Sequence, residues 1–306
     1  MVTGGTYRRR AVLAALASAG AIGAAPAVLA DAFAGQAPSI VRRAAPRLAA
    51  IDWAMMETAV ALGHVPVAGC ELIRFRADAI DPPLPDSVTD LGLRGAPNFE
   101  LLHLVRPDLI LSSPYYTRHA ARLQGIAPVL SLTFFEPGVP PLPRAMAALR
   151  ELAQAIDAPA AGDAATARTE AAFDALARRA QRFADRPVML IDMGDARHFR
   201  AFGADSLYGS TLQRIGLANG WTEGTRFSFA APVPLDRLAD IGDARFVLVS
   251  PVPLIAAGQL HRSALWNALP EVRAGQVLQL EPSNPFGAVP AALRFASLLV
   301  GALEAA

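Results

Sequence analysis

The chain of 306 residues contains one cysteine, Cys70. A single cysteine cannot form an intramolecular disulfide, and it excludes a cysteine-based zinc site and a Cys-x-x-Cys redox pair. The charge is nearly balanced, with 28 Lys and Arg against 27 Asp and Glu, a formal net charge of +1. Bulk electrostatics therefore gives no reason to expect nucleic acid or an anionic membrane surface as a partner.

Motifs that signal catalysis are also missing. The five histidines are scattered and show no HExxH or HxH spacing, and the chain has no Walker loop, no GxGxxG and no GxSxG. Asp192 and Asp195 follow an apolar segment, where catalytic acids often lie, but Gly194-Asp195 suits a turn better. We expect a binding protein with no catalytic residues, no metal ligands and no resident cofactor.

The N-terminus carries an export pattern. Arg8–Arg10 precedes the uncharged stretch Ala11–Ala30, and small residues flank it at Ala32–Ala34. A basic region, an apolar region and an Ala-x-Ala-like site predict a signal peptide over residues 1–34, and the paired arginines indicate the twin-arginine route to the periplasm. An uncleaved anchor is the alternative, although an Ala- and Gly-rich stretch is a weak membrane span. No cysteine follows the apolar region, which excludes a lipid anchor.

Short apolar segments alternate with helical segments in two parts of the chain, residues 45–140 and residues 187–306. The first part has expected strands at 47–51, 65–68, 88–93, 109–111 and 129–132, and helices at 53–62, 98–105 and 119–124. The second has expected strands at 188–191, 199–202, 246–249 and 277–280, and helices at 206–215, 234–239 and 288–303. This alternation predicts an α/β fold with two lobes, the first built on a parallel sheet.

Residues 141–186 separate the two parts and are predicted to be helical. Pro143–Ile156 is amphipathic, and Ala160–Phe183 has only thinly spaced apolar residues. A long polar helix with a narrow apolar stripe is typical of a strut between two domains, although a surface helix of one large domain is the other interpretation. Two lobes joined by a single long backbone helix would leave a cleft, and small ligands bind in such crevices.

Pro82–Leu102 contains the strongest candidate for a binding residue. Pro82, Pro83 and Pro85 exclude a central strand or helix interior, and the short strand that follows ends at Gly92. Arg94 therefore lies in a loop at the carboxyl end of a strand, where open α/β sheets bind ligands. Its planar guanidinium suits paired oxygen acceptors. The alternative is an ordinary exposed loop arginine.

Several segments together resemble the FhuD-type periplasmic binding proteins for hydroxamate siderophores. The matching segments are Pro82–Val88 (PPLPDSV), Gly92–Arg94 (GLR), Pro97–Leu102 (PNFELL), Arg106-Pro107, Arg197-His198, Phe202-Gly203, Ser206-Leu207, Asn219–Trp221, Leu235–Leu238, Leu265-Trp266 and Leu269-Pro270. The resemblance runs from about Arg47 to the C-terminus. It implies a shallow cleft, limited closure, and delivery of a ferric siderophore to the inner-membrane permease of an ABC importer.

The resemblance also implies site residues. Arg94 matches the arginine that contacts the hydroxamate oxygens, and Tyr116 matches a cleft tyrosine, with Tyr115 as the fallback if the loop shifts by one. The siderophore already saturates iron(III), so the protein supplies donors and no metal ligands. Where the family has cleft tryptophans, this chain has Ser112, Ser228 and Asn284. Phe227, Phe229 and Phe286 lie beside those positions and could line the cleft, or could belong to the core.

The resemblance finally implies a docking role. Asp236 fits the acidic residue that contacts the permease, while the first lobe has Arg118, His119 and Arg122 and no acid at the matching place. We expect a monomer whose partners are the ferric siderophore and the permease, with no nucleic acid. The alternatives are a protein of the same fold for a catecholate siderophore, a corrinoid or haem, an exported hydrolase, or a direct metal-ion binder.

Overall fold

The computed structural model describes residues 45–81, 83–223, 232–249 and 252–306. The expected export signal at residues 1–34 lies outside the described residues and stays a prediction. Ala44–Ala306 form one compact unit. Among the described residues, no helix combines the length and the apolar character that crossing a membrane requires.

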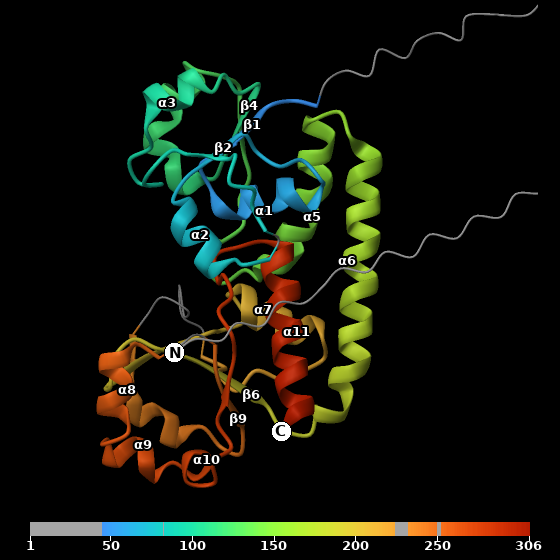
Figure 1. Cartoon of the computed structure of the whole chain (residues 1–306). Coiled ribbons are helices and arrows are strands. Elements are labelled where there is room, and N and C mark those ends of the chain that lie inside the picture. Colours follow the sequence, from blue (N-terminus) through green and yellow to red (C-terminus); the bar gives the residue numbers. More distant parts are fainter. Residues whose placement is uncertain (1–44, 82, 224–231, 250–251) are drawn as a thin grey trace, which may run out of the picture. The chain divides into compact units, whose positions relative to one another are not determined.

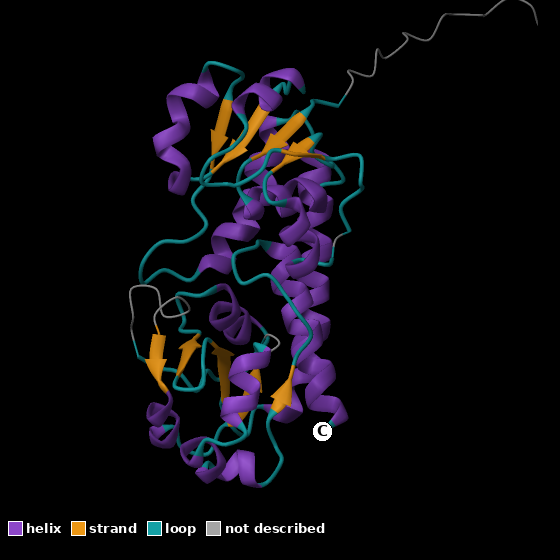
Figure 2. Cartoon of the chain, turned by 60° about the vertical axis from the view of Figure 1, so that its left-hand side comes forward, coloured by secondary structure: helices purple, strands orange, loops and turns teal. Residues whose placement is uncertain are grey.

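The first lobe is built on a parallel five-stranded sheet in the order β3-β2-β1-β4-β5. The strands are short and lie in the upper group in Figure 2. Their bounds are β1 Leu48–Ala50, β2 Ala68–Gly69, β3 Thr89–Asp90, β4 Leu109–Ser112 and β5 Val129–Ser131. Because β1 is central and the chain moves outward first to one side and then to the other, the order reverses between β1 and β4.

Helices connect these strands, and local sequence fixes where they begin and end. Asp52 caps the first helix by accepting hydrogen bonds from the N–H groups of Ala54 and Met55, and Gly63 ends it at φ +81°. Asn98 caps the third in the same way. The helices are α1 Trp53–Ala61, α2 Leu72–Asp78, α3 Phe99–Leu104, the 3₁₀ helix η1 Pro114–His119, and α4 Ala120–Gln124.

Two helices follow the first lobe and lead to the second. They are α5 Pro141–Ala155 and α6 Pro159–Ala180, which continues into the 3₁₀ turn η2 Gln181–Phe183. Figure 1 shows α6 running along the side of the unit from one lobe to the other, with α11 (Val289–Ala305) beside it. α11 packs against α1, α5, α6 and α7.

The second lobe has a mixed five-stranded sheet in the order β10-β9-β6-β7-β8. β6 pairs in parallel with β9, and β9 with β10, whereas β7 runs antiparallel to both β6 and β8. The strands are β6 Val188–Met193, β7 His198–Ala201, β8 Pro232–Pro234, β9 Arg245–Leu248 and β10 Leu278–Gln279. The helices are α7 Leu207–Arg214, the 3₁₀ helix η3 Leu235–Asp240, α8 Leu254–Leu260, α9 Ala264–Ala268 and α10 Pro270–Arg273.

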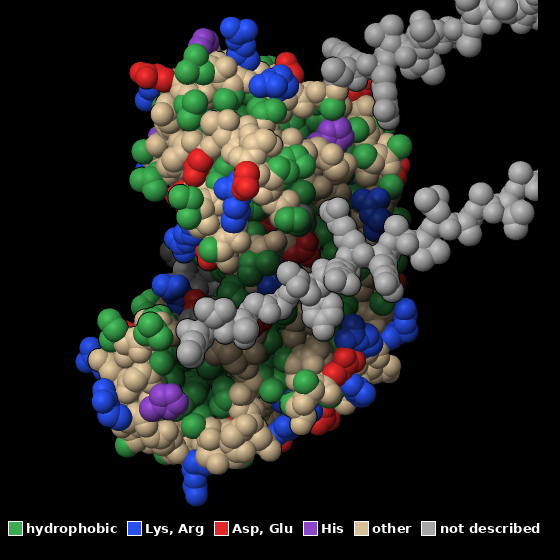
Figure 3. Space-filling view, viewed as in Figure 1, with side chains coloured by type: hydrophobic (Ala, Val, Ile, Leu, Met, Phe, Trp, Pro, Cys, Tyr) green, Lys and Arg blue, Asp and Glu red, His purple; other side chains and the backbone are tan. Residues whose placement is uncertain are grey.

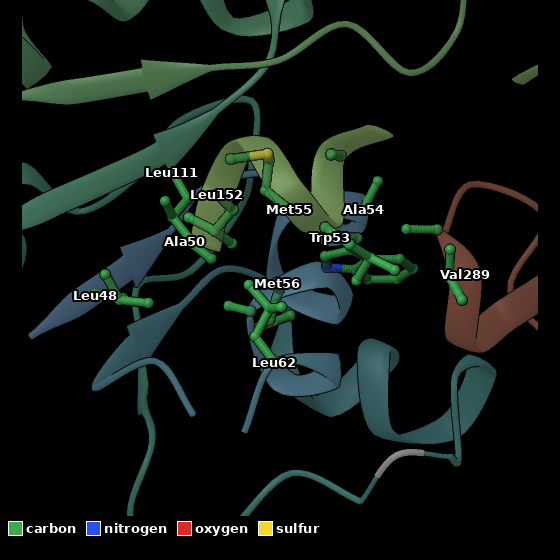
Figure 4. Packing of buried hydrophobic residues seen from close by; sticks show 14 of the residues in the cluster. Leu48, Ala50, Trp53, Ala54, Met55, Met56, Leu62, Leu111, Leu152 and Val289 are labelled. Carbon is green, nitrogen blue, oxygen red and sulfur yellow. The ribbon is translucent and has the colours of Figure 1, made fainter. Parts of the chain in front are cut away.

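The C-terminal helix α11 contributes to the cores of both lobes. Figure 4 shows Val289, at its first turn, close to Trp53 and Ala54 of α1 in the first-lobe core. Farther along, Phe295 and Leu299 belong to the cluster that includes β6 and α7. α11 therefore ties the two lobes together alongside α6. The boundaries at 45–140, 141–186 and 187–306 stay predictions.

The predicted fold class, two α/β lobes with a long linking helix, is confirmed. Three local predictions are wrong or incomplete. The strand at 65–68 is observed at Ala68–Gly69, the segment 234–239 is a 3₁₀ helix, and α2, α8, α9, α10 and β8 were not predicted. β8 begins and ends with proline, which an edge strand tolerates because that strand need not donate every N–H to a neighbour.

Candidate functional site

The point where the first sheet reverses its strand order is marked by a polar contact. Asp52 follows β1 and Ser113 follows β4, and the Ser113 hydroxyl donates a hydrogen bond of 2.8 Å to Asp52 Oδ2. In open α/β sheets such a switch point at the carboxyl ends of the strands is the usual ligand crevice. The site can therefore be built outward from this pair.

Arg94 lies at the same edge of the sheet, in the loop after β3, and its guanidinium is held in place from two sides. Its Nε donates to Glu71 Oε2 over 3.0 Å, and its backbone N–H donates to Glu71 Oε1 over 3.1 Å. Its guanidinium carbon lies 3.9 Å from the centre of the Trp53 ring, a cation–π contact. Among the described residues, none accepts a hydrogen bond from its two Nη groups. The two Nη groups are therefore available as hydrogen-bond donors.

Glu71 adopts an unusual backbone conformation to hold Arg94. It lies at φ +54°, in the left-handed region that costs a residue with a side chain about 1 kcal/mol or more. Its N–H donates to the Gly92 carbonyl over 2.8 Å, which links the ends of β2 and β3. Gly92, at φ +76°, turns the chain toward Arg94 where a side chain would be strained. The two loops thus form one support for the arginine.

The two candidate tyrosines lie on η1, directly after Ser113. Tyr116 is half-buried against the cluster beneath the sheet edge, and burial together with the nearby Asp52 charge raises the pKa of its hydroxyl to about 12. The positive charge of Arg94 has the opposite, smaller effect on that pKa. Tyr115 is 57% exposed. The structure therefore brings Arg94, Tyr116 and Tyr115 to one edge, as the resemblance implies.

A cavity of about 260 Å³ opens at this edge. It lies at the carboxyl ends of β1, β4 and β5, and its walls are largely apolar. The lining residues are Asp52, Ser113, Pro114, Tyr115, Thr133, Phe134, Phe135 and Pro137. Figure 3 shows the surface recessed between the two lobes, with hydrophobic side chains along the recess. The cavity combines a carboxylate with aromatic walls.

Phe286, in the segment before α11, contacts the cavity wall at Phe135. It is 42% exposed, and its ring packs edge-on against Phe135, with centroids 6.3 Å apart. Asn284, two residues earlier, is fully buried and donates to Glu57 Oε1, while its Oδ1 accepts from the Phe286 N–H. In this conformation the Asn284 side chain holds the chain in place, and the Phe286 ring packs behind Phe135 of the cavity wall.

The remaining predicted site residues are placed as follows. Ser112 is buried at the end of β4, with its hydroxyl near the Ser113 carbonyl, so that Ser113 and not Ser112 lines the cavity. Asp236 is exposed in the first turn of η3. Phe227, Ser228 and Phe229 lie outside the described residues and stay predictions.

Sequence reasoning missed Asp52, Glu71 and Ser113. Each lies one or two residues after a strand of the first sheet, and the rule that ligands gather at carboxyl ends could have selected Asp52 and Ser113 from the predicted strands alone. Glu71 was harder to find because the strand before it was predicted one residue too early. Of the described residues, no group of three or more His, Cys, Asp or Glu could hold a metal ion.

One lobe carries the candidate site, and the segment beside it leads into a helix that both lobes share. This is the organisation of a bilobal substrate-binding protein. The chain belongs to the periplasmic binding protein family, whose sequence profile matches residues 48–283. The Iron(3+)-hydroxamate-binding protein FhuD of Escherichia coli (strain K12) is 32% identical over 257 residues, which cover 84% of this chain and 86% of FhuD. The predicted resemblance to FhuD-type proteins is confirmed.

Solved structures share the fold. The siderophore-binding protein FhuD of Vibrio cholerae, with Fe³⁺-Desferal bound, matches with a TM-score of 0.78 at 23% identity, covering 85% of this chain and 98% of its own. The periplasmic catecholate-siderophore-binding protein VctP of Vibrio cholerae matches with a TM-score of 0.63 at 17% identity, covering 86% of this chain and 94% of its own. One fold thus serves both classes of siderophore.

Proposed function

We propose that this protein is the periplasmic binding component of an ABC importer, and that it carries an iron(III)-hydroxamate siderophore to the inner-membrane permease. The relative in Escherichia coli, at 32% identity over most of both chains, is an iron(3+)-hydroxamate-binding protein. The protein of known structure with the highest TM-score among those compared above holds a ferric hydroxamate. Both findings support a hydroxamate as the ligand.

The observation that carries this proposal is that Arg94 and Tyr116 both lie at the carboxyl edge of the first sheet. A siderophore fills the coordination shell of iron, so a protein recognises the complex by donating hydrogen bonds to the ligating oxygens. The free Nη groups of Arg94 supply charged donors, and Glu71 and Trp53 hold them in one orientation. The Tyr116 hydroxyl, with its pKa raised to about 12, stays protonated and able to donate.

The charge of the site favours a hydroxamate over a catecholate. Arg94 is already paired with Glu71, and Asp52 adds a carboxylate in the same cavity wall. A ferric tris-catecholate is trianionic and would meet no unpaired cation among these residues. A ferric trihydroxamate is neutral or cationic, and its apolar linkers fit the aromatic side chains of Tyr115, Phe135 and Phe286.

Fluorescence tests the ligand class, because Trp53 lies directly under the Arg94 guanidinium. The mature protein is titrated with ferrichrome, ferrioxamine, a ferric catecholate, haem and cobalamin, and each titration is repeated by calorimetry. We expect quenching with micromolar or tighter affinity by the hydroxamates. Binding confined to the catecholate, haem or cobalamin would overturn the ligand class, and binding of none would overturn the proposal. The ligand recovered afterwards should be intact, which would distinguish a carrier from a hydrolase.

Three further parts of the proposal concern the path of the protein in the cell. We propose export by the twin-arginine route, directed by residues 1–34, and action as a monomer. We also propose that Asp236, exposed at the start of η3, contacts the permease. An Asp236→Asn variant should bind the siderophore normally but support slower uptake, whereas equal uptake would overturn the docking role. Replacing Arg9 and Arg10 by lysine should leave the precursor in the cytoplasm.

A further inference from the structure

The cavity beside Arg94 is too small for an entire iron chelate. Its volume is about 260 Å³, whereas pockets that enclose a whole drug-sized ligand run from about 300 to 1,000 Å³. It therefore has room for one arm of a ligand whose iron centre lies outside, against Arg94 and Tyr116. The chemistry of its lining residues then indicates what that arm carries.

Among the described residues that line the cavity, Asp52 alone has a charged side chain. Its Oδ1 accepts from the N–H groups of Ala54 and Met55, at 2.8 and 3.1 Å, and its Oδ2 accepts from the Ser113 hydroxyl. All three donors are neutral, and among the described residues no cation forms an ion pair with Asp52. The carboxylate is oriented by these bonds, but its charge is not neutralised.

Arg94, the cation that acts on the charge of Asp52, already forms an ion pair with Glu71. Arg94 is near enough to lower the pKa of Asp52, but it does so less than the hydrogen bonds do, and its Nε is bonded to Glu71. Burial, the largest influence, raises the pKa of Asp52 above its ordinary value. A half-buried carboxylate without a counter-ion gains free energy when a cation arrives, because the cation offsets the cost of removing the charge from water.

The other walls suit the rest of a cationic arm. The rings of Tyr115, Phe134 and Phe135 line the same cavity. Aromatic and apolar walls accept a methylene chain, and aromatic rings also attract an ammonium group. An anionic or strongly polar arm would find a carboxylate and hydrophobic rings instead of donors.

We propose that this cavity binds an alkylammonium arm of the ferric hydroxamate, with Asp52 as its counter-ion. The preferred ligands are then hydroxamate siderophores that end in a protonated amine, in preference to neutral ones with the same iron centre. This inference rests on the proposed function and makes it more specific. It assigns Asp52 a role in ligand selection in addition to its role as the N-cap of α1.

A comparison of two ligands with the same iron coordination tests the inference. Ferrioxamine B ends in a primary amine, and its N-acetyl derivative carries a neutral amide at that position. Calorimetric affinities for both are measured on the wild-type protein and on Asp52→Asn. Asparagine caps helices about as well as aspartate: its Oδ1 can still accept from the Ala54 and Met55 N–H groups, and its amide N–H can donate to the Ser113 hydroxyl, so α1 is retained.

We expect the wild-type protein to prefer ferrioxamine B by about tenfold or more, the scale of a charge-assisted hydrogen bond. In Asp52→Asn the ratio of the two affinities should fall close to one. The ratio is taken on a single protein, so it cancels any general effect of the substitution on folding or affinity. If the variant does not fold, the wild-type ratio still decides whether the protein recognises the amine.

Two outcomes would overturn the inference. Equal affinity of the wild-type protein for both ligands would show that the amine is not recognised, although the protein would remain a hydroxamate carrier. A preference that persists unchanged in Asp52→Asn would place the cation site elsewhere. If neither ligand binds, the proposed function is overturned together with this inference, and that result is distinct from the other two.

Discussion

Asn284 donates a hydrogen bond of 2.7 Å to Glu57, although 227 positions separate the two residues in the chain. The second carboxylate oxygen of Glu57 accepts from the backbone N–H groups of Ala288 and Ala291, at 2.7 and 3.2 Å. These N–H groups begin α11, whose own N-cap position is an alanine with no capping side chain. A carboxylate on α1 therefore caps the C-terminal helix and joins the first lobe to it.

Gly287 should be irreplaceable at this contact. A Cβ atom there would lie 2.3 Å and 2.4 Å from the two carboxylate oxygens of Glu57 and 2.5 Å from the Ala291 Cβ. We expect Gly287→Ala to lower the free energy of unfolding by about 1–3 kcal/mol, the usual cost of overpacking, as measured by urea denaturation.

Gly301 on the same helix provides the matched control. A Cβ atom there meets nothing within 4 Å. Gly301→Ala should raise the free energy of unfolding by about 0.5–1 kcal/mol, because alanine is the better helix former. Equal effects of the two substitutions would contradict the described packing at Glu57.

Glu57 should make stability depend on pH. Burial raises the pKa of its carboxyl from 4.5 to about 7, and the hydrogen bonds from Ala288, Asn284 and Ala291 only partly oppose this rise. Between pH 4.5 and pH 7, the Glu57 carboxyl therefore keeps its proton in the folded state but has lost it in the unfolded state. The contribution of Glu57 to stability is full below pH 4.5 and falls as the pH rises toward 7, by about 3 kcal/mol.

The difference in unfolding free energy between the wild-type protein and Glu57→Gln isolates this effect. The wild-type protein should lose stability relative to the variant between pH 5 and pH 8, as followed by urea denaturation at several pH values. Other titrating groups are present in both proteins and cancel to first order. Parallel stability curves for the two proteins would show that Glu57 does not titrate in this range.

Much of the fold was predictable from the sequence because its signals are local. Alternating apolar and helical segments indicated two α/β lobes, and Gly63 and Asn98 marked the ends of helices that the structure confirms. α2 was missed because its start depends on Glu71 in a left-handed conformation, which no propensity predicts. The placement of Arg94 at the carboxyl end of a strand followed from the proline and glycine pattern around it.

The site was less predictable because its key contacts join distant segments. The ion pair of Arg94 with Glu71, the hydrogen bond of Ser113 to Asp52 and the cap of α11 by Glu57 all depend on tertiary packing. Asn284 was predicted at a cleft position, and the structure shows it fully buried beside Glu57. Asn284, which holds the lobes together, thus lies two positions before Phe286, which packs against the cavity wall at Phe135.

Tyr116 should contribute one hydrogen bond to the ligand, and Tyr115 less. Tyr116→Phe removes the hydroxyl and keeps the half-buried ring, so we expect the affinity for a ferric trihydroxamate to fall about 2–12-fold, equivalent to about 0.5–1.5 kcal/mol. Because the pKa of Tyr116 is raised to about 12, ionisation of this hydroxyl should not weaken wild-type binding between pH 8 and pH 10. A larger loss of affinity in Tyr115→Phe than in Tyr116→Phe would show that Tyr115, and not Tyr116, is the main hydroxyl donor to the ligand.

The central claim is that Arg94 binds the oxygens around iron. The most direct measurement compares calorimetric affinities for a ferric trihydroxamate of the wild-type protein, Arg94→Gln and Arg122→Gln. Arg122 is the matched control, because its guanidinium carbon lies 3.8 Å from the centre of the Phe99 ring, in the same kind of contact, and it lines a different hollow of the first lobe. We predict a loss of about 1.5–3 kcal/mol for Arg94→Gln, roughly 10- to 150-fold in affinity, and no more than about a twofold change for Arg122→Gln. Undiminished binding by Arg94→Gln, or equal losses in both variants, would contradict the account.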